Sequence, residues 1–305
     1  MTGVQTCALP IFNTAIVSFK DSQNKSFSTT WSFTLDYKSL NPANRVAGPG
    51  VAAGFQVHVV QAPPGSSLAN NIQRAEDQLK ANSQYERKVD VVEHADTINY
   101  DKKQEATVRG VFPDDILVPG LDSSVGLDDF TVEMVAYLDL SAGVHRFGVI
   151  SDDGYKLTSG TGLHDAATVP LAFHSGGPAN ETVDFVVSVA GLYPFRFVWY
   201  ERGGDGYAEF FSVDRVTGER TLINDLNSAA VVKAYAELAA PAVVLQSSAT
   251  LTGFADEPAG IVDTNAKTIT LIAPGSTQFY RVVAPTALHI KSILTQGNKI
   301  VLSYE

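Results

Sequence analysis

The stretch "HRFGVISDDGYKL", residues 145–157, decides the fold. An apolar run ends in two adjacent aspartates, Asp152 and Asp153, and a glycine and a tyrosine follow. Such a run, closed by turn-forming residues, is typical of a β-strand that gives way to a turn. Two neighbouring carboxylates at that point either accept hydrogen bonds from the turn or hold a cation. The pattern alone leaves both alternatives open.

Strand-like runs continue on both sides of this stretch. From about Glu86 onward the chain contains "FTVEMVAYLDL", "TVDFVVSV", "YPFRFVWYE" and "YAEFFSVD", separated by clusters of Gly, Asp, Ser and Asn. One face of "YPFRFVWYE" is aromatic and is predicted to be core: Tyr193, Phe195, Phe197 and Trp199. The expected fold is all-β and multi-module, with a central antiparallel β-barrel or sandwich over 86–228 and a small C-terminal β-module over 229–305. The segment "NSAAVVKAYAELAAP" fits either a helix or a strand.

Residues 40–85 are predicted to form a linker with one helix. The clusters "NPANRVAGPGVAAG" and "QAPPGSS" are rich in helix and strand breakers, and "FQVHVV" between them alternates like a short strand. Four apolar residues then follow at helical spacing, namely Leu68, Ile72, Ala75 and Leu79. Ser66 or Ser67 is available as the N-cap. Exposed linkers of this composition are preferred sites of proteolysis.

The first forty residues are expected to hold two unrelated segments. "TGVQTCALPI", residues 2–11, resembles a translated sequencing adapter, so residues 1–11 are expected to be an artefact. The single cysteine, Cys7, falls within it, which leaves the natural segment without a thiol or a disulfide. Residues 12–39 predict a β-hairpin around "DSQNK", similar to the last two strands of a bacterial immunoglobulin-like domain. We expect the rest of that domain and the signal peptide to be missing.

Charge and motifs exclude several functions. The chain carries 22 basic and 33 acidic residues, a formal net charge of −11, which disfavours nucleic acid and is compatible with divalent cations and neutral ligands. It has no run of 18 apolar residues, so no membrane span is expected. Nucleophile-elbow, phosphate-loop and zinc-protease motifs are absent from the sequence. No catalytic residue is predicted, although abundant carboxylates leave a glycosidase-type pair open.

The ordered set of motifs resembles the β-barrel module named after the anthrax protective antigen. A strand leads through "SAG" into "HRFGVISDDGYKL". "AGLYPFRFVWYE" then matches a later strand of the family, and "GGDGYAEFFSV" matches its closing strand. The resemblance covers roughly 108–225. The chain departs from the pattern at "LTSGTG", where many members have an Ile-Asp-Gly turn, and the second, asparagine-containing loop of the lectin members is not recognisable.

The resemblance implies a ligand site. In the sugar-binding members, consecutive aspartates joined by a cis peptide hold Ca²⁺, and the ion takes two sugar hydroxyls as ligands. Carried over to this chain, the metal ligands are Asp152 and Asp153. Asp205 in "GGDG" lies where a second ligand loop would sit, and it completes the expected ligand-binding set. Ca²⁺ needs ~6–8 oxygen ligands, so two carboxylates leave positions for a diol.

These expectations combine into a non-catalytic module of an exported bacterial protein. Its expected role is Ca²⁺-assisted recognition of a glycan or polysaccharide in adhesion, at the cell surface or outside the cell. Two alternatives remain. One is a structural spacer without a ligand, in which the aspartates only shape a turn. The other is an accessory domain of a carbohydrate-active enzyme whose catalytic domain lies elsewhere.

Overall fold

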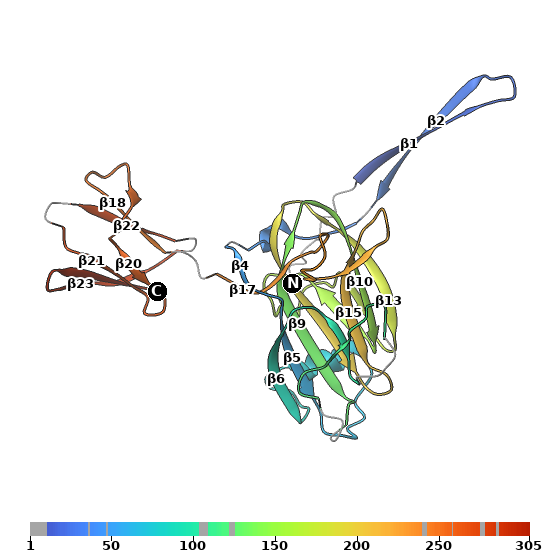
Figure 1. Cartoon of the computed structure of the whole chain (residues 1–305), viewed down its shortest axis with the longest axis horizontal. Helices are drawn as coiled ribbons and strands as arrows, with labels where there is room; N and C mark the ends of the chain where they lie inside the picture. The colour runs from blue at the N-terminus through green and yellow to red at the C-terminus, as the bar shows by residue number, and fades with distance from the viewer. Residues whose placement is uncertain are drawn as a thin grey trace. The chain divides into compact units, whose positions relative to one another are not determined.

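The computed structural model describes residues 11–35, 37–46, 48–103, 109–121, 126–239, 243–257, 259–274, 278–284 and 287–305. The expected adapter, including Cys7, lies outside these residues except for Ile11. The chain divides into two compact units, one of Met1–Val46 with Gly50–Glu237 and the other of Ala47–Pro49 with Leu238–Glu305. Both units are almost entirely β, which confirms the predicted class (Figure 1).

The first unit contains two sheets that are mostly antiparallel. The seven-stranded sheet has the order β3-β13-β10-β15-β7-β8, and β16 pairs with β15. Its strands are β3 (Lys38–Ser39), β7 (Asn99–Asp101), β8 (Ile116–Leu117), β10 (Gly143–Asp152), β13 (Ala179–Val187), β15 (Tyr207–Val213) and β16 (Arg220–Leu222).

The eight-stranded sheet has the order β12-β11-β14-β9-β17-β4, and β5 joins it between β9 and β6. Its strands are β4 (Gly50–Ala53), β5 (Phe55–Gln61), β6 (Val89–Ala95), β9 (Phe130–Leu140), β11 (Tyr155–Thr158), β12 (Ala172–His174), β14 (Gly191–Glu201) and β17 (Ala234–Leu238). The ambiguous segment before Pro241 is therefore a strand, β17. A short 3-10 helix, Pro42–Asn44, precedes β4.

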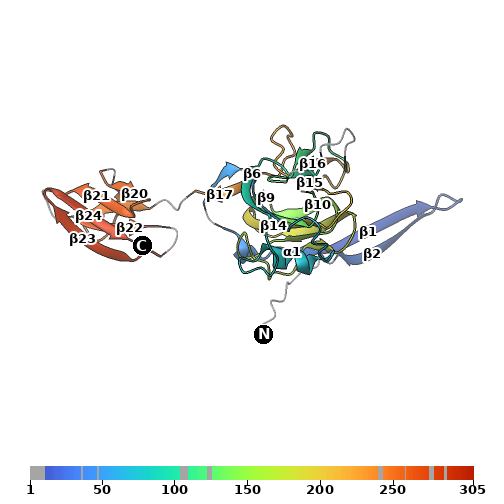
Figure 2. The same ribbon diagram turned by 90° about the horizontal axis from the view of Figure 1, so that it is seen from below.

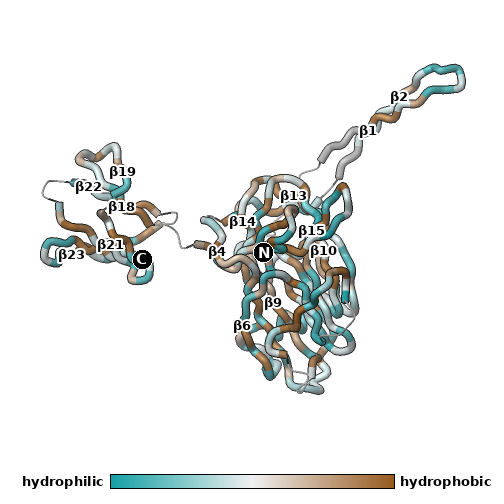
Figure 3. The backbone as a smooth tube through the Cα atoms, viewed as in Figure 1, coloured by the Kyte–Doolittle hydropathy of each residue, from teal (hydrophilic) through white to brown (hydrophobic). Residues whose placement is uncertain are grey.

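The core lies between the two sheets and is rich in aromatic side chains. All four aromatic residues predicted on one face of β14 are at most 2% exposed. Phe147 of β10 packs edge-on against Phe185 and Phe210 at 4.9 and 5.5 Å between ring centres. Aromatic pairs in this geometry add stability beyond the area that they bury. Hydrophobic residues accordingly follow β9 and β10 in Figure 3.

Helix α1 (Ile72–Leu79) packs on the eight-stranded sheet against β9 and β14 (Figure 2). Its buried Ala75 contacts Val198 and Tyr200. The N-cap is Asn71, whose side chain accepts a hydrogen bond from the Arg74 backbone N–H. The sequence prediction of a helix here is confirmed, but the predicted serine caps and the inclusion of Leu68 are wrong.

One prediction about the architecture is wrong. Residues 40–85 are not a linker, because β5 pairs with β9 on one side and β6 on the other. Val57 and Val59 of β5 are fully buried. Of the expected barrel or sandwich, the described residues form the sandwich, because both sheets end in unpaired edge strands and no closed barrel is present among these residues. Because the segment 40–85 is part of a sheet, its composition no longer predicts preferred proteolysis there.

The predicted N-terminal hairpin is present. β1 (Ile11–Lys20) and β2 (Ser26–Leu35) pair in antiparallel register around the turn that starts at Asp21. Asp21 accepts hydrogen bonds from the Gln23 and Lys25 backbone N–H groups, which fixes the turn.

The second unit is a small β-module with its own core. Leu245, Ile269 and Leu302 are among its buried residues. It holds a three-stranded sheet of order β19-β18-β22 and a four-stranded sheet of order β20-β21-β24-β23. The strands are β18 (Val244–Ser248), β19 (Ala255–Asp256), β20 (Ile261–Asp263), β21 (Thr268–Ile272), β22 (Phe279–Val283), β23 (Ile290–Gln296) and β24 (Lys299–Tyr304).

Across the described ranges, no helix is both long enough and apolar enough to cross a bilayer.

Candidate cation and ligand site

The aspartate pair lies where the chain passes from one sheet to the other. Asp152 is the last residue of β10 in the seven-stranded sheet, and β11 of the eight-stranded sheet begins at Tyr155. The Asp152–Asp153 peptide bond is cis, as the family resemblance implies. Gly154 is needed here, because a Cβ atom would lie 2.4 Å from the Tyr200 hydroxyl oxygen and 2.5 Å from a backbone carbonyl.

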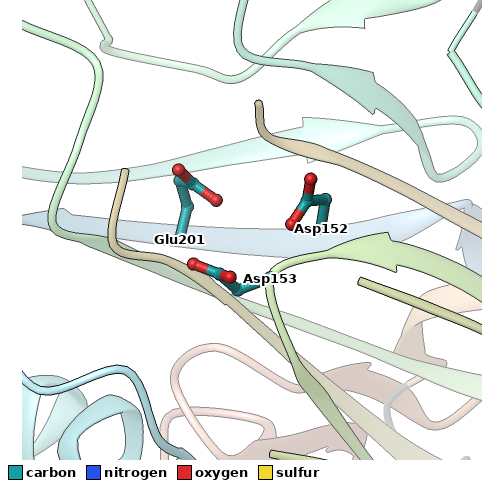
Figure 4. A group of neighbouring side chains, drawn as sticks. All are labelled: Asp152, Asp153 and Glu201. Atoms are coloured by element: carbon teal, nitrogen blue, oxygen red, sulfur yellow. The ribbon is translucent and has the colours of Figure 1, made fainter. Parts of the chain in front are cut away.

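Three carboxylates converge at this crossing. Glu201, the last residue of β14, joins Asp152 and Asp153, and one oxygen from each lies within 4.8 Å of the others. Figure 4 shows the three side chains pointing toward a common space. Glu201 is fully buried and Asp153 is 5% exposed, whereas Asp152 is half-buried. The group can therefore be reached from solvent on the Asp152 side.

The Asp153 carboxylate is held by donors on both oxygens. Oδ1 accepts a hydrogen bond from the Asn70 side-chain amide at 2.9 Å, and Oδ2 accepts one from the Arg202 backbone N–H at 2.9 Å. The Asp152 backbone carbonyl accepts a hydrogen bond from the Trp199 indole N–H at 2.9 Å. No hydrogen bond to the Asp152 carboxylate is found among the described residues. Asp153 is thus fixed, while the Asp152 side chain remains available.

Glu201 has one satisfied oxygen and one unsatisfied oxygen. Its Oε1 accepts a hydrogen bond from the Lys102 ammonium at 2.8 Å, and the same ammonium contacts Asp128 at 2.9 Å. The Lys102 side chain is 1% exposed, and its stem passes so close to Gly206 that a Cβ there would lie 2.7 Å from Lys102 Cδ. Glu201 Oε2 is buried without a hydrogen-bond partner. A buried carboxylate oxygen in this state carries a desolvation cost that a cation would remove.

The electrostatics of the group reflect crowded negative charge. Burial, then the Asp153 and Asp205 carboxylates, raise the pKa of Asp152 to about 6. Burial also raises the pKa of Glu201, and the two aspartates add to this effect while Lys102 opposes it. Burial acts to lower the pKa of Lys102, but its hydrogen bonds to Glu201 and Asp128 outweigh that effect and raise it. A divalent cation placed among the carboxylates would reverse the direction of the two acidic shifts.

The donor set fits Ca²⁺ or a similar hard cation. Ca²⁺ binds oxygen ligands at ~2.3–2.6 Å, so two ligands of one ion lie at most ~5 Å apart. The oxygens of Asp152, Asp153 and Glu201 satisfy this limit. The unpartnered Glu201 Oε2 supplies a ligand that nothing else in the described structure uses. The Lys102 ammonium neutralises one of the three charges, which leaves two for a divalent ion.

Asp205, predicted as a ligand, takes a different position. Its carboxylate forms a bidentate pair with the Arg109 guanidinium at 3.1 and 3.2 Å. It is not part of the three-carboxylate group, but it is close enough to raise the pKa of Asp152. Asp205 therefore lies on the rim of the site. The metal-binding and ligand-binding roles of Asp152, Asp153 and Asp205 stay predictions.

Three residues of the site were not predicted from the sequence. Glu201 continues the inward-facing alternation of Phe195, Phe197 and Trp199. A charged residue at an inward-facing position could have identified Glu201 as a candidate site residue. Lys102 and Asn70 carry no comparable pattern. Both lie far from the aspartate pair in the sequence, and only the folded chain brings them to it.

The carboxylate group does not lie in either of the two large hollows of the first unit. Two hollows of about 770 and 480 Å³ lie elsewhere on the first unit, and none of the three carboxylates lines either one. We assign the site from converging charge and the unpartnered oxygen, because small ions need ligand geometry rather than volume.

The raised pKa of Asp152 predicts a pH-dependent stability in the presence of a chelator. Its ordinary pKa is 3.8, and the folded value is about 6. Between these values the folded chain holds a proton that the unfolded chain has lost, so the free energy of unfolding falls as pH rises through this window. We expect Asp152→Asn to remove this contribution. Urea unfolding of both proteins across the window measures it, and parallel curves for the two would contradict the assignment.

A matched control for that series is Glu219→Gln, which removes one charge from an exposed turn of the same unit. Its stability should follow the wild-type protein across the same pH range.

One family model matches part of the chain. Residues 80–219 match the family model described as the PA14 domain. The matched range contains the three carboxylates and Lys102, whereas Asn70 and helix α1 precede it. No curated protein matches the chain.

Several solved structures are similar to the chain. The PA14 domain of the antifreeze protein MpAFP is 19% identical, with a TM-score of 0.41, over 63% of this chain and 96% of that one. The PA14 sugar-binding domain from an RTX adhesin is 17% identical, with a TM-score of 0.37, over 57% and 96%. The Epithelial Adhesin 9 A domain from Candida glabrata, in complex with Galβ1-3GlcNAc, is 14% identical, with a TM-score of 0.38, over 60% and 88%.

Proposed function

We propose that this protein binds Ca²⁺ through Asp152, Asp153 and Glu201, and that the ion holds neighbouring hydroxyls of a glycan. The observation that carries the proposal is the buried Glu201 Oε2, which lacks a hydrogen-bond partner and belongs to a group of carboxylates within 4.8 Å of one another. The match of residues 80–219 to the PA14 domain supports the same ligand class.

Coordination chemistry explains why an ion in this position would recruit a sugar. Three monodentate carboxylates supply about half of the ~6–8 oxygens that Ca²⁺ takes, and the remaining positions go to water or to a ligand. Asp152 is half-buried and marks the side on which solvent reaches the group. A vicinal diol can displace two waters there without a net change in charge. The ion supplies affinity, and the surrounding rim supplies selectivity.

The rim offers an aromatic and several polar groups. Tyr207 is the cross-strand neighbour of Asp152 and is half-buried. Burial, and after it the Asp152 carboxylate, raise the pKa of its hydroxyl. The pair Arg109–Asp205 adds charged hydrogen-bonding groups at the same edge. An aromatic ring beside polar groups is a common surface for sugar rings.

The proposed role is non-catalytic recognition by an exported bacterial protein, in adhesion or polysaccharide capture outside the cell. The proposal rests on the spacing of the three carboxylates, whose oxygens lie within 4.8 Å of one another and can share one ion.

A glycan array with and without a chelator tests the proposal. We expect retention on a subset of glycans in millimolar Ca²⁺, loss in chelator, and recovery when Ca²⁺ is restored. Asp152→Asn should lose retention, because it removes a charge without removing the side-chain shape. Glu219→Gln is the matched control and should bind as the wild type does. Retention that is unchanged by chelator would contradict the role of the ion.

A second candidate function is a spacer module without a ligand. The observation that favours it is the buried Lys102 ammonium, which already compensates Glu201. In that case Ca²⁺ would not change the melting temperature, and no glycan would be retained. The accessory-domain alternative shares the proposed site and differs only in the presence of a catalytic domain joined to it.

A further inference from the structure

A second hollow, separate from the carboxylate group, carries unbalanced negative charge. It has a volume of about 480 Å³ and lies among the β6–β7 connection, the segment before β8 and the segment after β16. Three aspartates line it, namely Asp96, Asp114 and Asp225, and its lining contains no Lys, Arg or His. Within the described ranges, neither Asp96 nor Asp114 has an ion-pair partner. Negative potential therefore accumulates in this hollow.

Part of the wall of the same hollow is apolar. Phe112, Ile116 and Leu226 line it, and the last two are 44% and 63% exposed. Phe112 is fixed by packing against the Phe211 ring, with ring centres 5.5 Å apart. Exposed apolar groups beside uncompensated carboxylates suit a ligand that has both an aliphatic part and a positive end.

A buried polar group at the hollow lacks a partner. Asn99 is 3% exposed, and its side-chain N–H donates to the Pro113 carbonyl at 2.8 Å. Its Oδ1 atom has no hydrogen-bond partner. By contrast, Asn224, which also lines the hollow, uses both ends of its amide, to the Asp96 carbonyl and the Ala234 N–H. The Asn99 Oδ1 atom is therefore a hydrogen-bond acceptor without a donor.

We propose that this hollow binds a lysine side chain of a partner polypeptide. The ammonium would be attracted by the three aspartates and directed toward the Asn99 oxygen, and the four-carbon stem would lie against Phe112, Ile116 and Leu226. A metal ion fits less well, because the only metal-spaced group among the described residues is the one formed by Asp152, Asp153 and Glu201. Charge complementarity and apolar walls together select an ammonium on an aliphatic chain.

Two matched peptides test the proposal on the full chain. One is acetyl-Gly-Lys-Gly-amide, and the other replaces lysine with norleucine, which keeps the stem and removes the charge. Each is titrated while backbone amide resonances are followed by NMR. We expect the lysine peptide to shift the resonances of Asn99, Ile116 and Asn227 in a saturable manner, and to bind at least about fivefold more tightly than the norleucine peptide.

Variants separate this site from the cation site. Asp114→Asn with Asp225→Asn should weaken the lysine peptide by about fivefold or more, while the melting temperature stays unchanged. Asp152→Asn should leave the peptide affinity as it is. Equal binding of both peptides, no binding of either, unchanged binding by the double variant, or loss in Asp152→Asn would each overturn the proposal.

Discussion

Replacing Trp199 with alanine should lower the free energy of unfolding by ~3–5 kcal/mol, a large part of the ~5–15 kcal/mol that holds a typical domain folded. Trp199 is 0% exposed and packs edge-on against Phe130, with ring centres 5.0 Å apart. Alanine would leave a cavity between the two sheets. It would also remove the indole N–H that donates to the Asp152 carbonyl. Urea unfolding followed by circular dichroism measures the change.

The other tryptophan is the control. Trp31 in the N-terminal hairpin is 60% exposed, so Trp31→Ala should change the stability of the first unit little. Trp199→Phe should lie between wild type and alanine, because it refills part of the cavity. A cost for Trp199→Ala no larger than that for Trp31→Ala would contradict the described core.

Replacing Arg196 with methionine should cost ~3–5 kcal/mol, because the buried Glu76 and Glu133 lose the guanidinium that they share and keep only Lys156 and His164 as partners. The Arg196 side chain is 4% exposed and donates to Glu133 and to both oxygens of Glu76 on helix α1, the latter at 2.7 and 2.8 Å. Glu133 also contacts His164. The variant therefore breaks the link between the helix and the eight-stranded sheet as well.

Arg146→Met is the control, because it removes an arginine from a solvent-exposed ion pair. Arg146 forms a bidentate pair with Asp184 at 2.6 and 2.8 Å, but its side chain is 36% exposed. Solvent screens such a pair, so its loss should cost only ~0–1 kcal/mol. Equal costs for Arg146→Met and Arg196→Met, measured by urea unfolding, would contradict the burial of the Arg196 network.

Local pattern was sufficient for most strands of the first unit. The run "FTVEMVAYLDL" is β9 from Phe130 to Leu140, and the aromatic alternation of β14 is buried as predicted. The residues "TQGNK", which include turn-forming Gly and Asn, connect β23 and β24. These elements could be predicted from the sequence because period-two alternation and turn chemistry depend on only a few neighbouring residues.

The pairing of strands that are far apart in the sequence could not be predicted in this way. The run "FQVHVV" was recognised as a strand but assigned to a linker, because glycine and proline flank it. Its partner β9 begins about seventy residues later, and no local signal identifies that pairing. Closure of a barrel likewise depends on which edges pair, so alternation could not distinguish a barrel from the sandwich that forms.

Only part of the candidate site could be predicted from the sequence. Asp152 and Asp153 were identified through the family resemblance, and the alternation of β14 could have added Glu201. Lys102 and Asn70 reach the group from segments remote in the sequence. Asp205 was expected among the ligands, but its pairing with Arg109 depends on a loop that the pattern does not define.

Calorimetric titration of Ca²⁺ into the metal-free protein tests the central claim most directly. The account predicts one saturable site per chain in the wild type and in Glu219→Gln. Affinity should fall at least about tenfold in Asp152→Asn, which removes one of the three charges that face the ion. Absence of binding by the wild type, or equal affinity in Asp152→Asn, would contradict a cation site formed by Asp152, Asp153 and Glu201.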